Sequence, residues 1–406
     1  MALKMSQQKP RLYREGEFGL SAVVVGVVED SRGFAALEEE WEDLYRNCPD
    51  ASPFQSWAWL YSWWEFYGEG RELRLITVRS GEGLLVGIIP LMLERRLGFG
   101  RLLFIGTGPT AHLDTVAREG WDDRVSEAGV RALRQMDDWH VADLHELRPD
   151  AAGWAIFERW SGHKTSIWQS QHAVIDATKG WDQLLMSRSK RLRNNARRAL
   201  RKAEADGVRC ELVGAEETKE AAHRLVTISR EQWHGNPLTR PDHWTPRFKS
   251  YFETFAYRMA ARGWGGIWEW RNDGEVIFSE FMVFGPSYVG AYMVGISRNA
   301  FRRYEVSALT ACTEVNIANH CGAPYVSLGR GHEPYKLRWA YALMPNHRLV
   351  LGCTPLIWGL YAGYHALRSA IKRYTHSPDS PRWVRDITNR YRVMRNVVSR
   401  YRRRMG

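Results

Sequence analysis

The order of secondary-structure elements expected along this 406-residue chain repeats, and the repeat restricts the fold more than any other feature. Between residues 20 and 175, apolar patterns predict a strand, two helices, three strands, a helix, a strand, a short helix and a final strand. A second pass between residues 208 and 351 follows the same order, with Asn272-Asp273-Gly274 as a tight hairpin turn. Alternating strands and helices of this kind predict an α/β fold with two tandem halves, each built on a mixed central sheet.

The repeat also gives the expected division of the chain. Residues 1–18 are polar and are expected to be a flexible N-terminus. The first domain is expected over residues 19–178 and the second over residues 179–352, which begins with a basic connecting helix at 180–206. Residues 353–406 complete the chain as an amphipathic helix and a basic tail.

Composition bears on compartment and partners. The five cysteines are odd in number and lack CxxC spacing, which argues against a disulfide framework or a zinc site and favours a reducing compartment. No uninterrupted apolar stretch reaches about 18 residues, so we expect a cytoplasmic protein. Separately, we expect no metal. Residues 366–406 hold twelve Lys and Arg against two Asp, which is +10 of the net charge of +11. The basic character therefore belongs to the tail and not to a nucleic-acid-binding core.

The C-terminal segment 355–406 combines an apolar helical stripe with basic sequence. Three interpretations remain open at this stage: contact with an anionic membrane surface, docking on the domain with a disordered tail, or contact with RNA. The first would make the protein peripheral at the inner membrane surface. The stripe consists of Leu356, Leu360, Tyr364, Leu367 and Ile371.

Four short segments carry a resemblance to a known family. They are Ser52–Trp57 (SPFQSW), Gly87–Leu91 (GIIPL), Ser189–Asn194 (SKRLRN, followed by two arginines) and Gly331–Trp339 (GHEPYKLRW). Together with the element order, they resemble the CelD/BcsL-like branch of the GNAT acyltransferases. Members of this branch carry two GNAT halves in tandem and are distantly related to the FemAB peptidyltransferases. The resemblance implies two tandem GNAT-like domains, the first of them degenerate and the second catalytic.

The resemblance also implies acetyl-CoA or another acyl-CoA as donor, and an amine or hydroxyl of a small-molecule or glycan acceptor in envelope or polysaccharide metabolism. GNAT enzymes hold the CoA pyrophosphate at a Q/R-x-x-G-x-G/A segment that opens a helix. The matching stretch here is Arg303–Ala308, in which Val306 stands at a glycine position and leaves an altered donor mode open. The expected donor contacts are Arg191, Arg303, Ser307, Ala308 and Lys336.

Acyl transfer needs a base for the acceptor, an acid for the leaving group and a stabilised oxyanion. Glu280 lies in an expected core strand, where burial gives a carboxylate the raised pKa of a base, unless it points to solvent. Tyr335 and Lys336 follow the turn Gly329-Arg330-Gly331, at the end of a strand where open α/β sheets bind ligands. In a catalytic interpretation Tyr335 protonates the leaving thiolate and Lys336 stabilises the oxyanion. The alternative is a solvated helix start anchored by Tyr335 and Trp339.

Candidate acceptor contacts are mostly aromatic. Trp59 and Trp63 lie off the apolar stripe of the helix expected at 54–67, and Trp233 follows another helix. His332 and Glu333 complete the expected acceptor contacts.

A basic run separates the two halves. Arg188–Lys202 holds eight basic residues and no acidic one, which suits either a phosphate clamp or a solvated helix face. This run and the tail keep a FemAB-like transferase that uses aminoacyl-tRNA open as an alternative. A non-catalytic binding protein with this fold is the other alternative.

Overall fold

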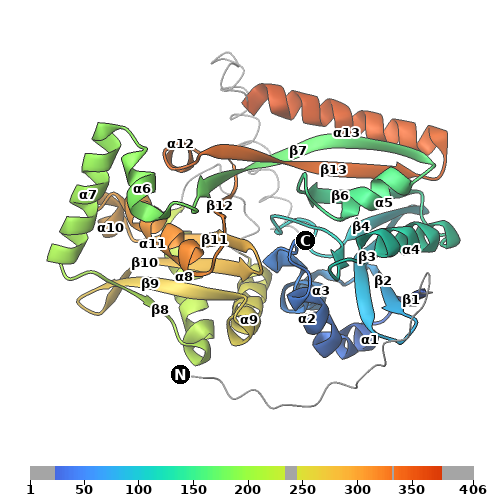
Figure 1. Ribbon diagram of the computed structural model, residues 1–406, viewed down its shortest axis with the longest axis horizontal. Helices are drawn as coiled ribbons and strands as arrows, with labels where there is room; N and C mark the ends of the chain where they lie inside the picture. Colours follow the sequence, from blue (N-terminus) through green and yellow to red (C-terminus); the bar gives the residue numbers. More distant parts are fainter. Residues whose placement is uncertain (1–22, 234–244, 332, 377–406) are drawn as a thin grey trace, which may run out of the picture.

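A single mixed sheet runs through the whole molecule in this computed structural model, which describes residues 23–233, 245–331 and 333–376 (Figure 1). The strand order is β1-β2-β3-β4-β6-β13-β7-β12-β11-β10-β9-β8, and β5 pairs with β3 off this path. Only β4 with β6 and β11 with β12 pair in parallel among the described strands. The protein has an α/β fold with two tandem GNAT-like halves and a helical C-terminal region.

The first half follows the predicted element order. Its strands are β1 (Val23–Val28), β2 (Glu72–Ser80), β3 (Leu85–Arg96), β4 (Phe99–Phe104), β5 (Val116–Ala117), β6 (Val141–Leu147) and β7 (His163–Asp176). Its helices are α1 (Ser31–Ala36), α2 (Glu38–Arg46), α3 (Trp57–Tyr67, after a 3-10 turn at Pro53–Gln55), α4 (Asp122–Gln135) and α5 (Gly153–Arg159).

The second half repeats that order. Its strands are β8 (Arg209–Leu212), β9 (Gly265–Asn272), β10 (Glu275–Gly285), β11 (Tyr288–Ile296), β12 (Tyr325–Arg330) and β13 (Ala342–Gly352). Its helices are α6 (Gly180–Met186), α7 (Lys190–Ala205), α8 (Thr218–Gln232), α9 (Pro246–Arg262), α10 (Arg298–Arg303), α11 (Val306–His320) and α12 (Pro334–Leu337), and α13 (Pro355–His376) follows the last strand.

Three predicted helices differ from the observed ones. The connecting helix expected at 180–206 is two helices, because Ser189 is extended and its side chain caps a new helix by accepting from the backbone N–H of Leu192. A helix was also expected at 303–320; it begins only at Val306, because the extended backbone of Tyr304 separates it from α10, which ends at Arg303. The helix expected at 333–342 is the single turn α12, and Ala342 already begins β13.

The strand β13 joins the two halves in a way that the element order does not predict. Although it follows the second half in sequence, it lies between β6 and β7 of the first half and pairs antiparallel with both. The end of β7 in turn pairs with β12 of the second half. The sheet therefore has no break between the halves. The division of the chain into two domains between residues 178 and 179 stays a prediction.

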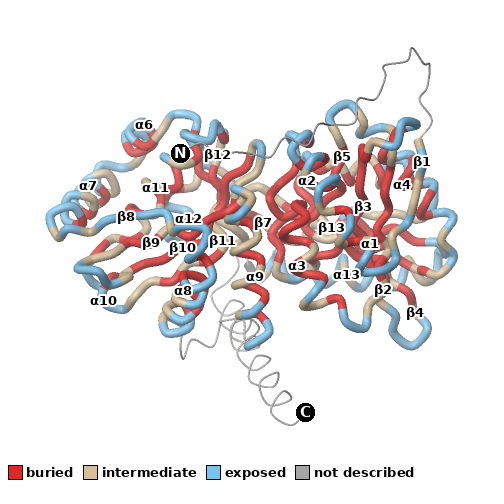
Figure 2. The backbone as a smooth tube through the Cα atoms, turned by 90° about the horizontal axis from the view of Figure 1, so that it is seen from below, coloured by how far each residue is buried: buried red, intermediate tan, exposed pale blue. Residues whose placement is uncertain are grey.

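The aromatic helix α3 lies in the core between the halves. Trp59 is fully buried, donates from Nε1 to Thr110 Oγ1 at 3.0 Å and contacts Phe255 of α9 and Tyr292 of β11. Figure 2 shows the buried interior continuing from one half into the other, with exposed residues on the outer helices. Helices α8 and α9 cover one face of the second half's sheet and α6, α7 and α11 cover the other.

A buried carboxyl pair under the loop after strand β12

The most unusual feature of the second half is a pair of carboxyl groups in its apolar core. Glu280 on β10 and Glu314 on α11 are 0% and 3% exposed. Glu280 sits across from Trp268 on β9 and Val294 on β11, so the neighbouring strand positions are apolar. Within the described part of the chain, neither Glu280 oxygen has a hydrogen-bond partner while both carboxyls are ionised, and the neighbouring polar group is the carboxyl of Glu314. An ionised carboxylate in such a place destabilises the folded state, so the protonated carboxyl is favoured.

Burial is the main reason that the pKa of Glu280 lies well above its ordinary value, and the neighbouring Glu314 raises it further. Burial also raises the pKa of Glu314, while the charge of Lys336 opposes that rise. Because two adjacent carboxyls cannot both ionise easily, the pair retains a proton near neutral pH. Such a pair can take up or release a proton during a reaction.

The loop after β12 covers this pair, with α12 above α11 in Figure 1. Tyr335 is half exposed, and its pKa is raised by burial and then by the carboxylates of Glu333, Glu314 and Glu280. Lys336 is buried, donates from Nζ to the carbonyl of Arg330 at 2.9 Å and pairs with Glu333 at 3.0 Å. The structure thus brings together Glu280, Tyr335, Lys336 and Glu333, four of the residues selected from the sequence.

Glu314 is a site residue that the sequence analysis missed. It stands on the buried face of α11 with Ala311, Val315 and Ala318, so a glutamate at an apolar helical position was the available signal. His332 lies outside the described residues.

The expected pyrophosphate segment is occupied by the protein's own side chains. Ser307 Oγ donates to Glu305 at 2.8 Å and accepts from Trp339 Nε1 at 3.2 Å. Glu305 also pairs with Arg338 at 3.2 Å, and Val306 and Ala308 are buried. The positive end of α11 therefore already faces a carboxylate, and these residues do not fit a CoA pyrophosphate in the usual GNAT position.

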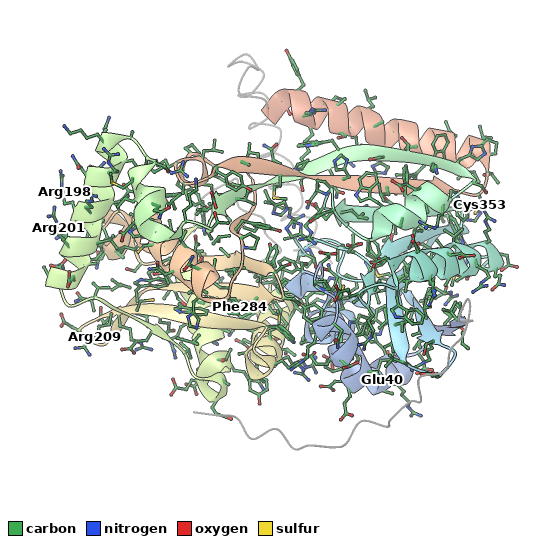
Figure 3. All side chains as sticks on the ribbon, in the orientation of Figure 1. Glu40, Arg198, Arg201, Arg209, Phe284 and Cys353 are labelled. Carbon is green, nitrogen blue, oxygen red and sulfur yellow. The ribbon has the colours of Figure 1, made fainter. Side chains whose placement is uncertain are left out.

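The guanidinium groups of Arg303 and Arg191 lie elsewhere than the start of α11. The Arg303 guanidinium pairs with Asp206 at 2.9 Å and is half exposed. Arg191 is exposed at the start of α7. The segment just before this helix lies beside the end of α12, since Arg188 Nη2 donates to the carbonyl of Trp339 at 2.6 Å. Further along α7, Arg198 and Arg201 project from the outer edge of the molecule (Figure 3). The outer face of α7 is therefore basic and solvated.

A buried polar network connects the loop after β12 to the first half. Arg330 Nη1 pairs with Glu146 at 3.0 Å, and its Nη2 donates to the carbonyl of Gly108 at 2.8 Å. Asn346 Nδ2 donates to Glu146 at 2.8 Å, and the rings of His112 and His172 lie 4.2 Å apart beside it. Burial lowers the pKa of both histidines, that of His172 to about 3, so both are neutral at pH 7.

The sequence analysis did not select these network residues. Glu146 has a positive φ of 58°, which is uncommon for a residue with a side chain and marks a constrained position. Because Lys336 donates to the carbonyl of Arg330, the network fixes the loop that carries Tyr335 and Lys336. The turn around Arg330 was visible in the sequence, but its partner in the first half was not.

Two of the three tryptophans selected as acceptor contacts are buried and therefore do not line a groove. Trp59 and Trp63 are buried, because most of α3 lies in the core between the halves, and neither indole faces a groove. Trp233 is 40% exposed at the end of α8. A shallow pocket lies instead beside β8, close enough to the pair that Glu280 contributes to the raised pKa of Cys210 in its wall. It is lined by Cys210, Trp268, Phe284, Thr313, Asn316, Ile317, His320 and Cys321.

Residues 190–337 match the family profile described as an acetyltransferase (GNAT) domain. The fold is a GNAT fold. This matched segment contains Glu280, Glu314 and Lys336, so the carboxyl pair lies in the recognised GNAT domain. No significant match was found among curated protein sequences.

Solved structures share the GNAT fold over most of the chain. FemX is 14% identical with a TM-score of 0.57, covering 77% of this chain and 95% of FemX. The C-terminal DUF2156 domain of a putative lysylphosphatidylglycerol synthetase from Agrobacterium fabrum is 13% identical with a TM-score of 0.52, covering 84% and 97%. L-PGS from Bacillus licheniformis is 11% identical with a TM-score of 0.51, covering 82% and 97%. At these identities the likeness concerns the fold alone.

Two findings concern the metal site and the membrane-spanning helix that were considered from the sequence. Across the described ranges, no cluster of three or more His, Cys, Asp and Glu side chains is arranged to hold a metal ion. No helix in those ranges has both the length and the apolar character needed to cross a bilayer.

Proposed function

We propose that the protein is a cytoplasmic acyltransferase of the CelD/BcsL-like branch that acts on an amine or hydroxyl of a sugar, polysaccharide or cell-envelope precursor. The single observation that supports this most strongly is the buried Glu280–Glu314 pair beneath Tyr335 and Lys336, inside the segment that matches a GNAT domain. Perturbed carboxyls of this kind suit proton transfer during acyl transfer.

The chemistry follows from the groups at the site. The acceptor nitrogen or oxygen attacks the carbonyl carbon of the acyl donor and loses its proton to the carboxyl pair. The bond from that carbon to the donor's sulfur or oxygen then breaks, and Tyr335 supplies a proton to the leaving atom. Lys336 holds the loop through Arg330 and places a positive charge near the developing oxyanion.

The acceptor enters, in this proposal, through the pocket beside β8. Trp268 is partly exposed there and offers an indole face next to Glu280 across the strand pair. Trp268 thus takes the role that we expected for Trp59 and Trp63. A Trp268→Phe variant should keep acceptor KM within about threefold, whereas Trp268→Ala should raise it about tenfold through the lost ring contact.

The direct test of the pair is acyl transfer by Glu280→Gln and Glu314→Gln variants. Removing a group that acts as an acid or base lowers the rate by about a hundredfold or more. Glu275→Gln, at the exposed start of the same strand, is the matched control and should retain full activity. Full activity in both pair variants would reject the proposed role.

The donor in this proposal is acyl-CoA, bound without the usual pyrophosphate cradle. Arg191, exposed at the start of α7, is the cation proposed for its phosphates, because Lys336 lies at the acyl end of the donor in this proposal. The occupied N-terminus of α11 favours a second candidate, an aminoacyl ester of tRNA, for which the basic face of α7 is a suitable contact. FemX, which shares the fold, is the structural neighbour that motivates this comparison.

Thermal unfolding with acetyl-CoA, longer acyl-CoAs, free CoA and tRNA separates the donors. A ligand at a hundred times its Kd stabilises the folded state by about 2.7 kcal/mol. Stabilisation by one acyl-CoA that is lost in Lys336→Ala would support the first donor. Stabilisation by tRNA that weakens steeply with salt would support the second. No shift with any of them, together with no transfer activity, would leave a non-catalytic binding protein.

A further inference from the structure

The helix α13 exposes an apolar face along most of its length. The face includes two tyrosines and four aliphatic residues, each between 54% and 72% exposed. They recur every three or four positions, so they form one continuous stripe over 19 of the helix's 22 residues, about 27 Å of helix. Its members are Leu356, Leu360, Tyr364, Leu367, Ile371 and Tyr374.

The opposite face of α13 is firmly attached to the protein, so the stripe has a fixed orientation. Ala362 is buried against Val141, Ile167 and Val350 of the sheet. Tyr361 donates to Asp143 Oδ2 at 2.5 Å, and Ser369 donates to the carbonyl of Trp168. Figure 1 shows α13 along the upper edge of the molecule, outside β7 and β13, and the stripe lies on the side away from those strands.

The charges around the stripe have one sign. Arg368 is exposed and borders the stripe, while the exposed Lys372 and Arg373 reach toward β7, where Lys372 donates to the carbonyl of Gln169. Residues 355–376 contain no Asp or Glu. The sequence that follows, residues 377–406, adds nine arginines and only two aspartates. An apolar stripe flanked by cations and tyrosines is the surface that anionic lipid headgroups and acyl chains complement together.

A second copy of the chain is a poorer fit to this face. A two-fold contact through this face would pack α13 against its own copy, and a stable interface buries about 800 Å² on each partner. Such a contact would also bring arginines of both copies together, with no acidic residue on either α13 to pair with them.

We propose that the outer face of α13 docks on an anionic lipid bilayer, with the helix parallel to the membrane plane. The apolar stripe enters the boundary between headgroups and acyl chains, and the cations contact lipid phosphates. This inference does not depend on the proposed acyl transfer, since it rests on α13 alone.

The test is co-sedimentation of the full chain with vesicles of phosphatidylcholine, or of an equal mixture of phosphatidylcholine and phosphatidylglycerol. We expect binding to the anionic vesicles that weakens as salt is raised. Leu360→Ser with Leu367→Ser should lower the partition coefficient about tenfold or more, and Arg368→Glu with Arg373→Glu should lower it to a similar extent. Leu97→Ser with Leu212→Ser, which changes two leucines exposed elsewhere, is the matched control and should bind like the parent.

Three results would overturn the proposal. Unchanged binding by the Leu360→Ser, Leu367→Ser variant would assign binding to the basic tail and not to α13. Equal binding to neutral and anionic vesicles would remove the role of the cations. A dimer in sedimentation equilibrium that the same leucine variant dissociates would assign the face to a second copy. Thermal unfolding of each variant shows whether it is folded, and the arginine variant tests the face independently of the leucines.

Discussion

A carboxyl group that is held in an apolar layer binds its proton more tightly in the folded protein than in the unfolded chain. This applies to Glu280, whose pKa is raised by burial and by Glu314. Its contribution to stability is therefore fully present below the unfolded value and is lost as pH rises through the raised folded value. At neutral and higher pH, the native glutamate is a destabilising residue that a neutral isostere can replace.

We predict that Glu280→Gln raises the free energy of unfolding at pH 8 by at least about 1 kcal/mol, since each unit of pKa shift corresponds to about 1.4 kcal/mol. At pH 4 the variant and the parent should differ little, because the parent's carboxyl is then mostly protonated in both the folded and the unfolded chain. Urea denaturation at the two pH values measures this. Glu275→Gln, which is exposed, should show no pH-dependent gain, and the same gain in this control would contradict the explanation.

The ion pair between the halves gives a prediction of opposite sign. Arg330→Gln leaves Glu146 with a buried charge that has lost its cation, and we expect a loss of about 2–3 kcal/mol in unfolding free energy. The double variant with Glu146→Gln should lose less than the sum of the two single variants. Strict additivity in urea denaturation would show that the two side chains are not coupled.

Residue patterns could locate part of the site but not its assembly. Glu280, Tyr335 and Lys336 were selected because they sit in or after expected core strands. Three further residues were not selected: Glu314, Glu146 and Asn346. Each interacts with a partner at least 34 positions away in the sequence, as Asn346 does with Glu146. A single sequence gives no information on which strands become neighbours.

Single elements were predicted well wherever periodicity was strong. Strands were expected at 264–271, 275–284 and 287–294, and the ends of β9, β10 and β11 lie within two residues of these limits. The helix at 180–206 was expected to be continuous and the next one to begin at Arg303, because capping by Ser189 and the extended backbone at Tyr304 are local effects that periodicity does not register. The stripe on α13 was identified correctly as one face, yet its exposure depends on how the opposite face packs.

The aromatic helix α3 provides a test at this scale. Because Trp59 is enclosed between the halves, we predict that Trp59→Ala lowers the unfolding free energy by about 3–5 kcal/mol. Trp233→Ala removes a 40% exposed indole and should change it by no more than about 0.5 kcal/mol. Denaturant titrations compare the two. A small loss in Trp59→Ala would mean that this helix does not hold the halves together.

The whole molecule behaves as one cooperative unit if the continuous sheet and shared core determine its stability. Trp59 of the first half packs on Phe255 of the second, and β13 pairs with both β6 and β7. We predict one calorimetric transition whose van't Hoff and calorimetric enthalpies agree. Two resolved transitions would show that the halves unfold separately.

Truncation tests the same point. A chain ending at residue 341 lacks β13, so β6 and β7 lose their shared neighbour in the middle of the sheet. We expect such a chain to be insoluble or unfolded by circular dichroism, because central strands carry buried apolar side chains and unpaired backbone groups. A folded, soluble fragment would show that β13 is an addition to an already stable first half.

The position of β13 also sets a schedule for synthesis on the ribosome. About 165 residues separate the end of β7 from the start of β13, so the first half cannot close its sheet until nearly the whole chain has emerged. At about 5–20 residues per second, that interval is on the order of 10–30 s. During this time β6 and β7 have unpaired edges, so a newly made molecule is most prone to aggregate in that window.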